Sequence, residues 1–335
     1  MKVSGNRNRC VDEMLARGCI IILLLSIANQ ASAQSCRQDT AMKIPITGVK
    51  GSLQNPCFIS LTGSLLAFTN FTTRYNIGNA IVKTVSVHGG NPLLTLSPTT
   101  SQSVNLPGIQ GCWSSAKGLV TYTSDVVDRD EVYTVQVTGG TPKRITNRPG
   151  YVAFEPSFSP VLSDGSQWIV FESHKVSNTA CCGEIWKVRS DGTGLRRLTT
   201  GFDDRQPEWS PRKDKIAFQR QVSPDNWDIF TIDINGNNLF NVTNNPRAGN
   251  TDCSWSPSGN YIVYSAGGTD INVANLFIIA ASGGTPLRLT NSCGLDGAPG
   301  WSPDGSRIAF ESAPFDADLK GSTAIWIIAV PRGIR

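Results

Sequence analysis

Histidine is scarce in this 335-residue chain, in which only His88 and His174 occur. A zinc site with three histidine ligands therefore cannot be built from this sequence. A serine nucleophile would have few bases to activate it, and the G-x-S-x-G motif of α/β-hydrolases is absent. We therefore expect no catalytic residues, and the sequence favours a binding protein over an enzyme.

Charge is also sparse, because charged residues make up 17% of the chain and the formal net charge is +4. No run of Lys or Arg accompanies this charge, so nucleic acid is not an expected partner. No segment has the roughly eighteen consecutive apolar residues that a membrane span needs, so no transmembrane segment is expected. The cysteines lack C-x-x-C spacing, and we expect no metal site.

The N-terminal region has the order of residues that is typical of a secretory signal peptide. Lys2, Arg7, Arg9 and Arg17 precede the apolar run CIIILLLSI at 19–27, and the small residues ASA follow at 31–33. We predict a signal peptide over residues 1–33, cleaved near Ala33, and therefore a secreted or periplasmic protein. An uncleaved signal anchor is the alternative.

The rest of the chain repeats itself. The string PGWSPDGSRIAFES at 299–312 matches CSWSPSGNYIVYSA at 253–266 and PEWSPRKDKIAFQR at 207–220. Weaker copies lie at 156–173, 111–124 and 56–70. Each copy has one aromatic anchor, and the six anchors are Phe58, Trp113, Phe158, Trp209, Trp255 and Trp301. Asp304-Gly305 predicts a hairpin turn within the last copy.

A second signature follows each anchor, as in NLFIIAASGGTPLRLTN at 275–291. It contains an aromatic residue, a turn and then Leu, Ile or Val before Thr. Apolar residues alternate within the copies, as at Ile308 and Phe310, which is the pattern of strands with one face in a core. Four short strands repeated about every 40–50 residues predict a β-propeller. We predict an all-β fold, a six-bladed β-propeller of four-stranded blades, over residues 55–335.

The sixth copy ends before a fourth strand. The segment 34–54 contains MKIPIT at 42–47, in which Ile46-Thr47 mirrors Leu289-Thr290. We therefore predict that an N-terminal strand completes the last blade and closes the ring. A disordered N-terminal tail is the alternative.

The recurring P-x-W-S-P-D-G-x-x-I-A-F string with its downstream G-G-x-x-x-x-L-T resembles the propeller repeats of the TolB family of cell-envelope proteins. The resemblance covers about residues 41–335. It implies a TolB-like, WD-like propeller, and partner binding through the propeller mouth, as in the family, is a hypothesis for this chain. The TolB family has an α/β domain before the propeller, and this sequence leaves no room for one after the signal peptide.

The segments that enter the inner strands hold the densest polar cluster that this topology brings together. We expect these residues to meet at one mouth of the central channel, where they form the candidate binding site. The residues are Glu155, Asp203, Asp204, Arg205, Glu208, Asn250, Asp252 and Asp296. The alternative is that they form only the solvated rim that every propeller has.

Several functions fit such a site. The leading one is a non-catalytic, monomeric propeller that binds a protein or cell-envelope component through its mouth loops. The alternative is a lyase or glycosidase acting on uronic-acid polysaccharides, since glycosidases need two carboxylates. We expect no cofactor, although the acidic rim also suggests calcium binding.

Seven cysteines follow the predicted cleavage site, which favours disulfides in an exported protein. Cys253 and Cys293 belong to the same mouth, and we consider them a candidate pair. Cys36 is a candidate partner for Cys57. Cys57 and Cys112 occupy equivalent places before neighbouring anchors. The sequence does not settle the pairing.

Overall fold

The computed structural model describes residues 37–105, 111–177, 182–224, 226–245, 249–267, 273–313 and 322–334. Within these ranges the chain is all-β and has no helix. None of this described part contains a helix that could span a membrane. The predicted signal peptide and Cys36 lie outside it.

Three of the sheets are antiparallel and have four strands in chain order. The first sheet contains β2 (Ser52–Phe58), β3 (Leu65–Phe71), β4 (Ala80–Ser86) and β5 (Leu94–Thr95). The third contains β11 (Tyr151–Phe158), β12 (Trp168–Lys175), β13 (Glu184–Arg189) and β14 (Arg196–Arg197). The fourth contains β15 (Asp204–Trp209), β16 (Lys215–Ser223), β17 (Asn226–Asp233) and β18 (Phe240–Asn241).

The second sheet has five strands because its inner strand is split in two. It contains β6 (Ser103–Val104), β7 (Trp113–Ser114), β8 (Leu119–Ser124), β9 (Glu131–Gln136) and β10 (Lys143–Arg144). The last sheet has eight strands. One half contains β19 (Gly249–Trp255), β20 (Tyr261–Gly267), β21 (Ala274–Ala280) and β22 (Leu287–Arg288). The other contains β23 (Leu295–Trp301), β24 (Arg307–Ala313), β25 (Ala324–Ala329) and β1 (Met42–Lys43). One bridge, from Ala274 to Leu295, joins the two halves.

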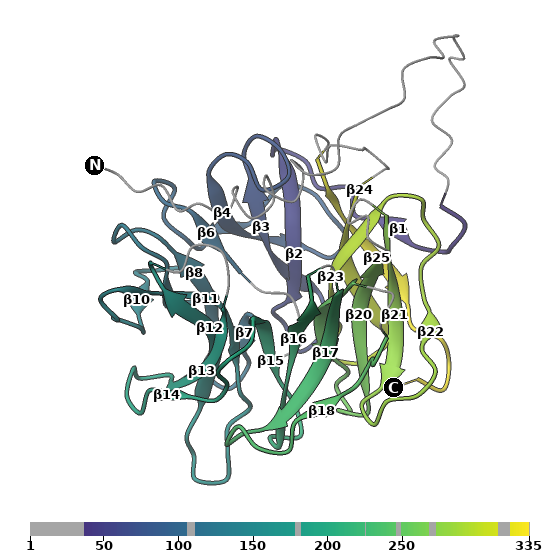
Figure 1. Cartoon of the computed structure of the whole chain (residues 1–335). Coiled ribbons are helices and arrows are strands. Elements are labelled where there is room, and N and C mark those ends of the chain that lie inside the picture. Colours follow the sequence, from purple (N-terminus) through teal and green to yellow (C-terminus); the bar gives the residue numbers. More distant parts are fainter. Residues whose placement is uncertain are drawn as a thin grey trace, which may run out of the picture.

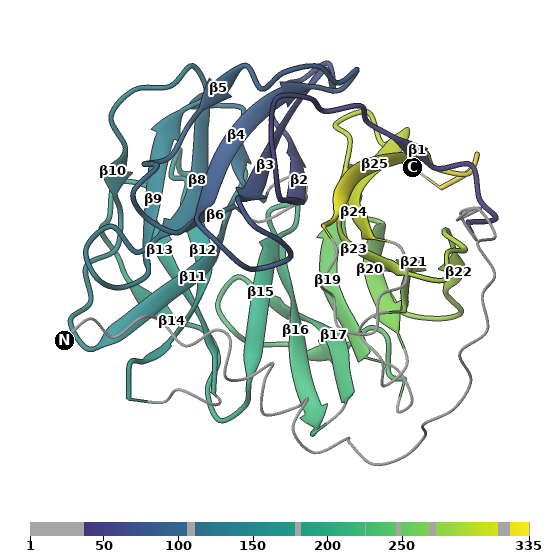
Figure 2. The same cartoon turned by 90° about the horizontal axis from the view of Figure 1, so that it is seen from above.

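The sheets radiate from a common centre, which is the arrangement of a β-propeller. In Figure 1, β2, β15 and β23 lie near the centre, and β10, β14 and β22 lie at the periphery. Figure 2 shows the same sheets from above, following one another around that centre.

The aromatic anchors are buried as the repeat predicts. Trp209, Trp255 and Trp301 are at most 1% exposed. Each anchor packs on the second and third strands of the preceding sheet or half-sheet, as Trp209 does on Val170 and Ile185. The core therefore lies between the sheets.

The repeated threonine of the second signature holds the outermost strand in place. The Thr290 hydroxyl accepts a hydrogen bond from the Leu276 amide at 2.9 Å, and Thr243 does the same for Ile229 at 3.0 Å. Each outermost strand is only two residues long, so its backbone forms few hydrogen bonds with the third strand. The threonine side chain adds one more hydrogen bond between the two. The Leu-Thr motif is thus a structural feature of the repeat.

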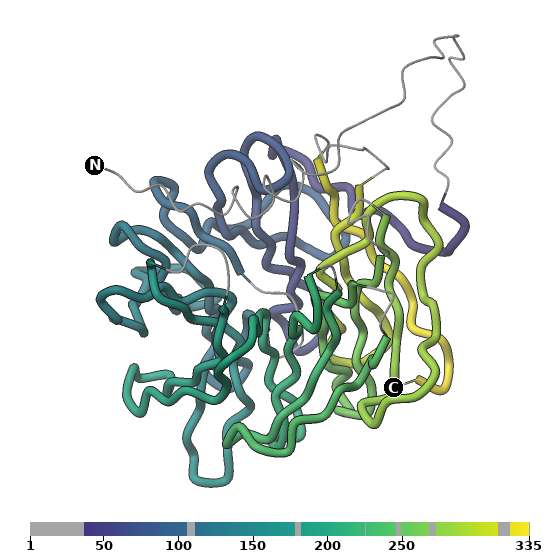
Figure 3. The backbone as a smooth tube through the Cα atoms, in the orientation of Figure 1, coloured from purple at the N-terminus to yellow at the C-terminus, as the bar shows by residue number. Residues whose placement is uncertain are grey.

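The N-terminal segment pairs with the C-terminal strand, where the purple and yellow ends of the chain lie side by side (Figure 3). Met42 pairs with Ile327 and Lys43 with Trp326. The Ile44 amide donates to the Ile325 carbonyl at 2.9 Å, as the Leu289 amide does to Leu276 at 2.8 Å. Matching Ile46-Thr47 to Leu289-Thr290 is therefore wrong by two residues.

The cysteine pairing differs from expectation. Cys57 is bonded to Cys112 and not to Cys36. Cys253 is a free, buried thiol, whereas Cys293 is in a disulfide, so the Cys253–Cys293 pair is wrong. Equivalent places in adjacent sheets face one another, and this brings Cys57 and Cys112 together. The bond ties the first sheet to the second.

Removing the Cys57–Cys112 bond should destabilise the fold. The bond closes a loop of 55 residues, and a disulfide of this kind contributes about 2–4 kcal/mol by restricting the unfolded chain. We expect Cys57→Ala/Cys112→Ala to lose that much in urea unfolding. Cys253→Ala, which removes a free buried thiol, should cost about 1 kcal/mol or less. Equal losses in the two variants would contradict this role.

Candidate functional site

A polar residue faces the centre at the same point of most inner strands. Three residues before five of the six anchors, Trp113 being the exception, the ladder shifts register, so each of these five strands contains a β-bulge. The bulged residues have left-handed backbone angles, with φ between 47° and 52°. They are Asn55, Glu155, Gln206, Asp252 and Ala298. Bulges re-aim side chains and recur beside functional sites, so this ring of positions defines the candidate site.

Asp204, in contrast, is a structural residue. It is fully buried and receives two hydrogen bonds from Arg220, at 2.6 and 2.8 Å. Burial raises the pKa of Asp204, although the Arg220 hydrogen bonds oppose this effect. The Arg220 guanidinium also lies over the rings of Phe218 and Phe230. Asp204 is therefore held in an ion pair inside the fold, and its role at the mouth stays a prediction.

Asp296 occupies the equivalent place and is also buried. Its partner is Arg37, whose Nη2 lies 2.5 Å from the carboxylate and 2.8 Å from the Ser312 hydroxyl. The Arg37 guanidinium lies 4.6 Å from the centre of the Trp326 ring. Since Ser312 stands where β16 has Arg220, the N-terminal segment supplies the missing guanidinium. Asp296 thus fixes that segment, and its role as a binding residue stays a prediction.

Glu208 and Asn250 are buried structural residues as well. The Glu208 carboxylate accepts a hydrogen bond from the Trp255 amide at 2.8 Å, which links two neighbouring inner strands. The Asn250 amide donates to Asp228 at 3.0 Å. The mouth location predicted for these two residues stays a prediction.

The remaining predicted residues lie in two connected groups. The first, which we call the arginine group, consists of Arg205, Asp203, Glu155 and Glu172. Arg205 donates two hydrogen bonds to Asp203, at 2.9 and 2.6 Å, and lies over the Trp227 ring at 5.2 Å. Burial lowers the pKa of Arg205, but the Asp203 hydrogen bonds and the charges of Glu172, Asp203 and Glu155 outweigh it and raise the pKa.

His174 stands at the edge of the arginine group. Its Nδ1 is 3.6 Å from the Glu172 carboxylate, and its ring lies against Phe154. His88 is exposed in the turn after β4, as the sequence predicts.

The second group, which we call the acid pair, consists of Asp252 and Glu311. Gln206 connects the two groups, because its side chain accepts from the Asp252 amide at 3.2 Å and donates to Glu155 at 3.4 Å. Glu311 accepts from the Asn55 amide at 3.1 Å. Both carboxylates approach Gly297, where a Cβ would lie 3.5 Å from Glu311 and 3.7 Å from Asp252.

The surroundings of Glu311 favour its protonated form. Burial, together with the nearby charge of Asp252, raises the pKa of Glu311 to about 8. Tyr75 hydrogen-bonds to Glu311, and burial and the charges of Glu311 and Asp252 raise the pKa of Tyr75. Burial also raises the pKa of Asp252. The acid pair can therefore donate hydrogen bonds and attract cations.

Sequence reasoning missed Glu172, Gln206, Glu311, Tyr75 and Trp227. A signal for Gln206 was present, since the residue three places before the anchor is polar in most repeats, as Asn55, Glu155 and Asp252 show. Tyr75 and Trp227 have no such signal because they come from connecting segments and a third strand.

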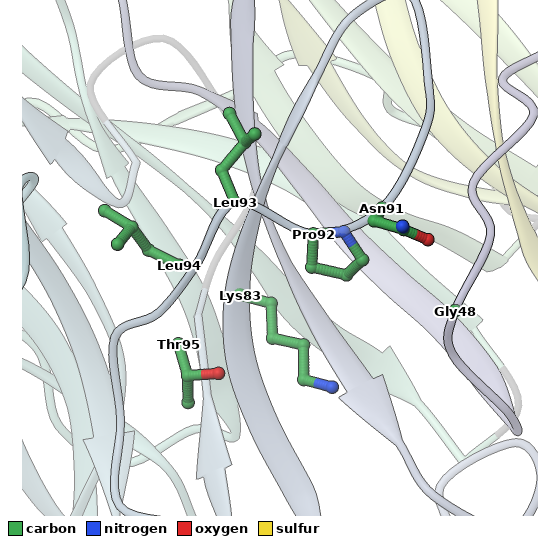
Figure 4. A pocket seen from close by; sticks show the side chains of 7 residues that line it. All are labelled: Gly48, Lys83, Asn91, Pro92, Leu93, Leu94 and Thr95. Carbon is green, nitrogen blue, oxygen red and sulfur yellow. The ribbon is translucent and has the colours of Figure 1, made fainter.

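Two cavities lie away from these groups. The larger, of about 400 Å³, opens beside β4 and β5 and is shown in Figure 4. It is lined by Gly48, Lys83, Asn91, Pro92, Leu93, Leu94 and Thr95. The smaller, of about 220 Å³, lies between turns of the fourth sheet and the β19 half. Across the described ranges, no set of three His, Cys, Asp or Glu side chains is arranged to hold a metal ion.

The chain matches no family model. It is 27% identical over 229 residues to an uncharacterized protein of Agrobacterium fabrum, a match that spans 65% of this chain and 71% of the relative.

Solved structures resemble it more widely. A putative TolB from Agrobacterium tumefaciens is 17% identical with a TM-score of 0.57, over 83% of this chain and 90% of that one. TolB from Acinetobacter baumannii is 18% identical with a TM-score of 0.60, over 82% of this chain and 65% of that one. A gluconolactonase from Xanthomonas campestris is 13% identical with a TM-score of 0.57, over 91% and 94%. The fold is a TolB-like β-propeller. At these identities the likeness concerns the fold alone.

Neutralising Asp204 should unfold the protein more readily than neutralising an exposed acid. We expect Asp204→Asn to lose roughly 3–5 kcal/mol in urea unfolding, because it leaves the buried Arg220 guanidinium without its counter-charge. Asp214→Asn, at an exposed turn, should change stability by about 0.5 kcal/mol at most. A small effect of Asp204→Asn would favour its predicted role at the mouth.

Glu311 should make stability depend on pH. Its pKa in the folded protein is about 8 against 4.5 as the ordinary value, so the folded state binds more protons between these values. Stability should therefore fall as the pH rises through this window. We expect thermal unfolding of Glu311→Gln to vary less with pH between 5 and 9 than that of the wild type, whereas Asp214→Asn keeps the wild-type slope. Parallel curves for all three proteins would contradict the assignment.

Proposed function

We propose that this protein is an exported, non-catalytic propeller that binds a protein or cell-envelope component at its centre. The observation that carries the proposal is the arginine group. Arg205 is 33% exposed and is oriented by Asp203, next to the half-buried Glu155. Four of the eight predicted residues serve the fold, so binding falls to the residues of the two connected groups.

The net charge of the two groups indicates which kind of partner segment can bind at the centre. Three carboxylates surround one guanidinium in the arginine group, and the acid pair adds further acidic groups. Such a site favours a cationic or hydrogen-bonding segment over an anionic one. The TolB-like fold supports recognition of a protein.

We also infer that the two halves of the eight-stranded sheet are separate blades, which gives six blades in a closed ring. Phe58 packs with Ala309 and Ile325 of the last half-sheet, and β1 completes that half-sheet. The disulfide and the signal-like N-terminus support export to the periplasm or beyond. We further propose that the protein acts as a monomer and needs neither nucleic acid nor a cofactor. The α/β domain of TolB has no counterpart in this proposal, and calcium binding by the acidic residues stays a hypothesis.

The binding proposal is tested by retention of partners from an envelope extract on immobilised protein. We expect Glu155→Gln/Arg205→Gln to retain at least fivefold less of a specific component than the wild type. Asp214→Asn/Lys215→Gln changes the same charges at an exposed turn and should retain as much as the wild type. Equal retention by all three proteins would remove the centre as the binding site.

A second candidate is a glycosidase or lyase acting on uronic-acid polysaccharides. The protonated Glu311 beside Asp252 favours it, because carboxyl groups with different protonation supply acid and base chemistry. Reducing-end and ultraviolet assays on anionic polysaccharides should then detect products that Glu311→Gln abolishes. Absence of products with the wild type would reject the enzyme and leave the binding proposal intact.

A further inference from the structure

The outermost strands of the second and third sheets each carry two adjacent cations. β10 consists of Lys143 and Arg144, and β14 of Arg196 and Arg197, and all four are exposed. We call them the rim cations. The other outermost strands hold at most one cation, as in Leu94–Thr95, Phe240–Asn241, Leu287–Arg288 and Met42–Lys43.

The rim cations are in matching positions on neighbouring sheets. Arg144 pairs with Tyr133 and Arg197 with Trp186, which are equivalent aromatic residues of the repeat. Lys143 directly precedes Arg144, and Arg196 directly precedes Arg197, so Lys143 and Arg196 are also in equivalent positions. Figure 1 shows β10 and β14 on the same side of the periphery. The four charges therefore form a row along the outer edge of two successive sheets.

Contacts also join the second, third and fourth sheets near these cations. Lys117 of the second sheet donates to the Ser190 hydroxyl of the third at 2.7 Å. Hydrogen bonds from Thr193 lower the pKa of Asp191 in the turn of the third sheet, and the charges of Arg189 and Lys143 add to this effect. Arg196 in turn donates to the Asn235 carbonyl of the fourth sheet at 3.4 Å.

Most of this charge is not neutralised within the protein. Lys143, Arg144 and Arg196 form no ion pair with another residue of the described ranges. Arg197 contacts Glu184 at 3.1 Å, but its side chain is still 50% exposed. An exposed pair of this kind contributes little to stability, so the fold does not explain why these cations are clustered.

We propose that the rim cations bind a linear anionic polysaccharide that runs along the outer edge of the second and third sheets. Arginine matches carboxylate and sulfate groups with paired hydrogen bonds, and repeated charges on a chain can engage successive cations. A flexible chain can follow the convex periphery of a propeller, whereas a flat bilayer would touch it over a short stretch. This surface is separate from the centre, so it does not depend on the central binding site.

The test is binding to alginate, a linear carboxylated polysaccharide, measured by isothermal titration at 20 and 200 mM NaCl. We expect binding at low salt that weakens at high salt, because salt screens exposed charges. Lys143→Gln/Arg196→Gln should bind about tenfold more weakly than the wild type. Lys213→Gln/Lys215→Gln removes the same charge from an exposed turn of the fourth sheet and should stay within twofold.

The proposal would be overturned by no binding of alginate at 20 mM NaCl, by equal weakening in the two variants, or by unchanged affinity in Lys143→Gln/Arg196→Gln. Vesicles of phosphatidylcholine with phosphatidylglycerol, and a DNA duplex, serve as alternative polyanions. Tighter binding of either one than of alginate would also overturn it. Circular dichroism of both variants checks that they are folded, since all four positions are exposed.

Discussion

Packing between sheets is the constraint on which the rest of this structure depends. A four-stranded sheet has two faces, and its anchor aromatic is covered by strands of the preceding sheet, as Trp301 is by Val263 and Leu276. No single repeat can bury its core alone, so the repeats must stand around a common centre. Each inner strand then has a side that faces the centre and cannot be covered by its neighbours. The polar residues of the candidate site lie on that side.

The repeat explains what could be predicted. The structure confirms the features that the repeat predicts. These are the anchors such as Trp255, the alternating residues such as Ile308 and Phe310, and the Asp304-Gly305 turn. The environment of the central polar residues was harder to predict. Side chains of an inner strand point in alternate directions, and the sequence does not show which polar residues become buried. Asp252 lies three residues before its anchor, on the bulge, whereas Asp204 lies five residues before its anchor and pairs with Arg220.

Three arginines occupy equivalent places in the fold but do not align in the sequence repeats. Arg220, Arg148 and Arg37 lie over the equivalent aromatics Phe230, Trp186 and Trp326. They come from a second strand, a connecting segment and the N-terminal segment. The place in the fold is repeated, but the sequence position that fills it is not. Sequence alone therefore could not pair Asp296 with Arg37, because the pair depends on where the N-terminal segment lies in space.

The distribution of charge separates two surfaces that the modest net charge hides. Carboxylates gather at the centre, where neighbouring sheets bring inner strands together, and burial favours the protonated form of Glu311 instead of forcing a counter-cation. Cations gather on β10 and β14, where strands two residues long leave long side chains in water. The centre can thus discriminate among partners by hydrogen bonds and desolvation, while the rim acts through screened, additive charge. The two surfaces should therefore respond differently to salt, strongly at the rim and weakly at the centre, even though one repeat generates both.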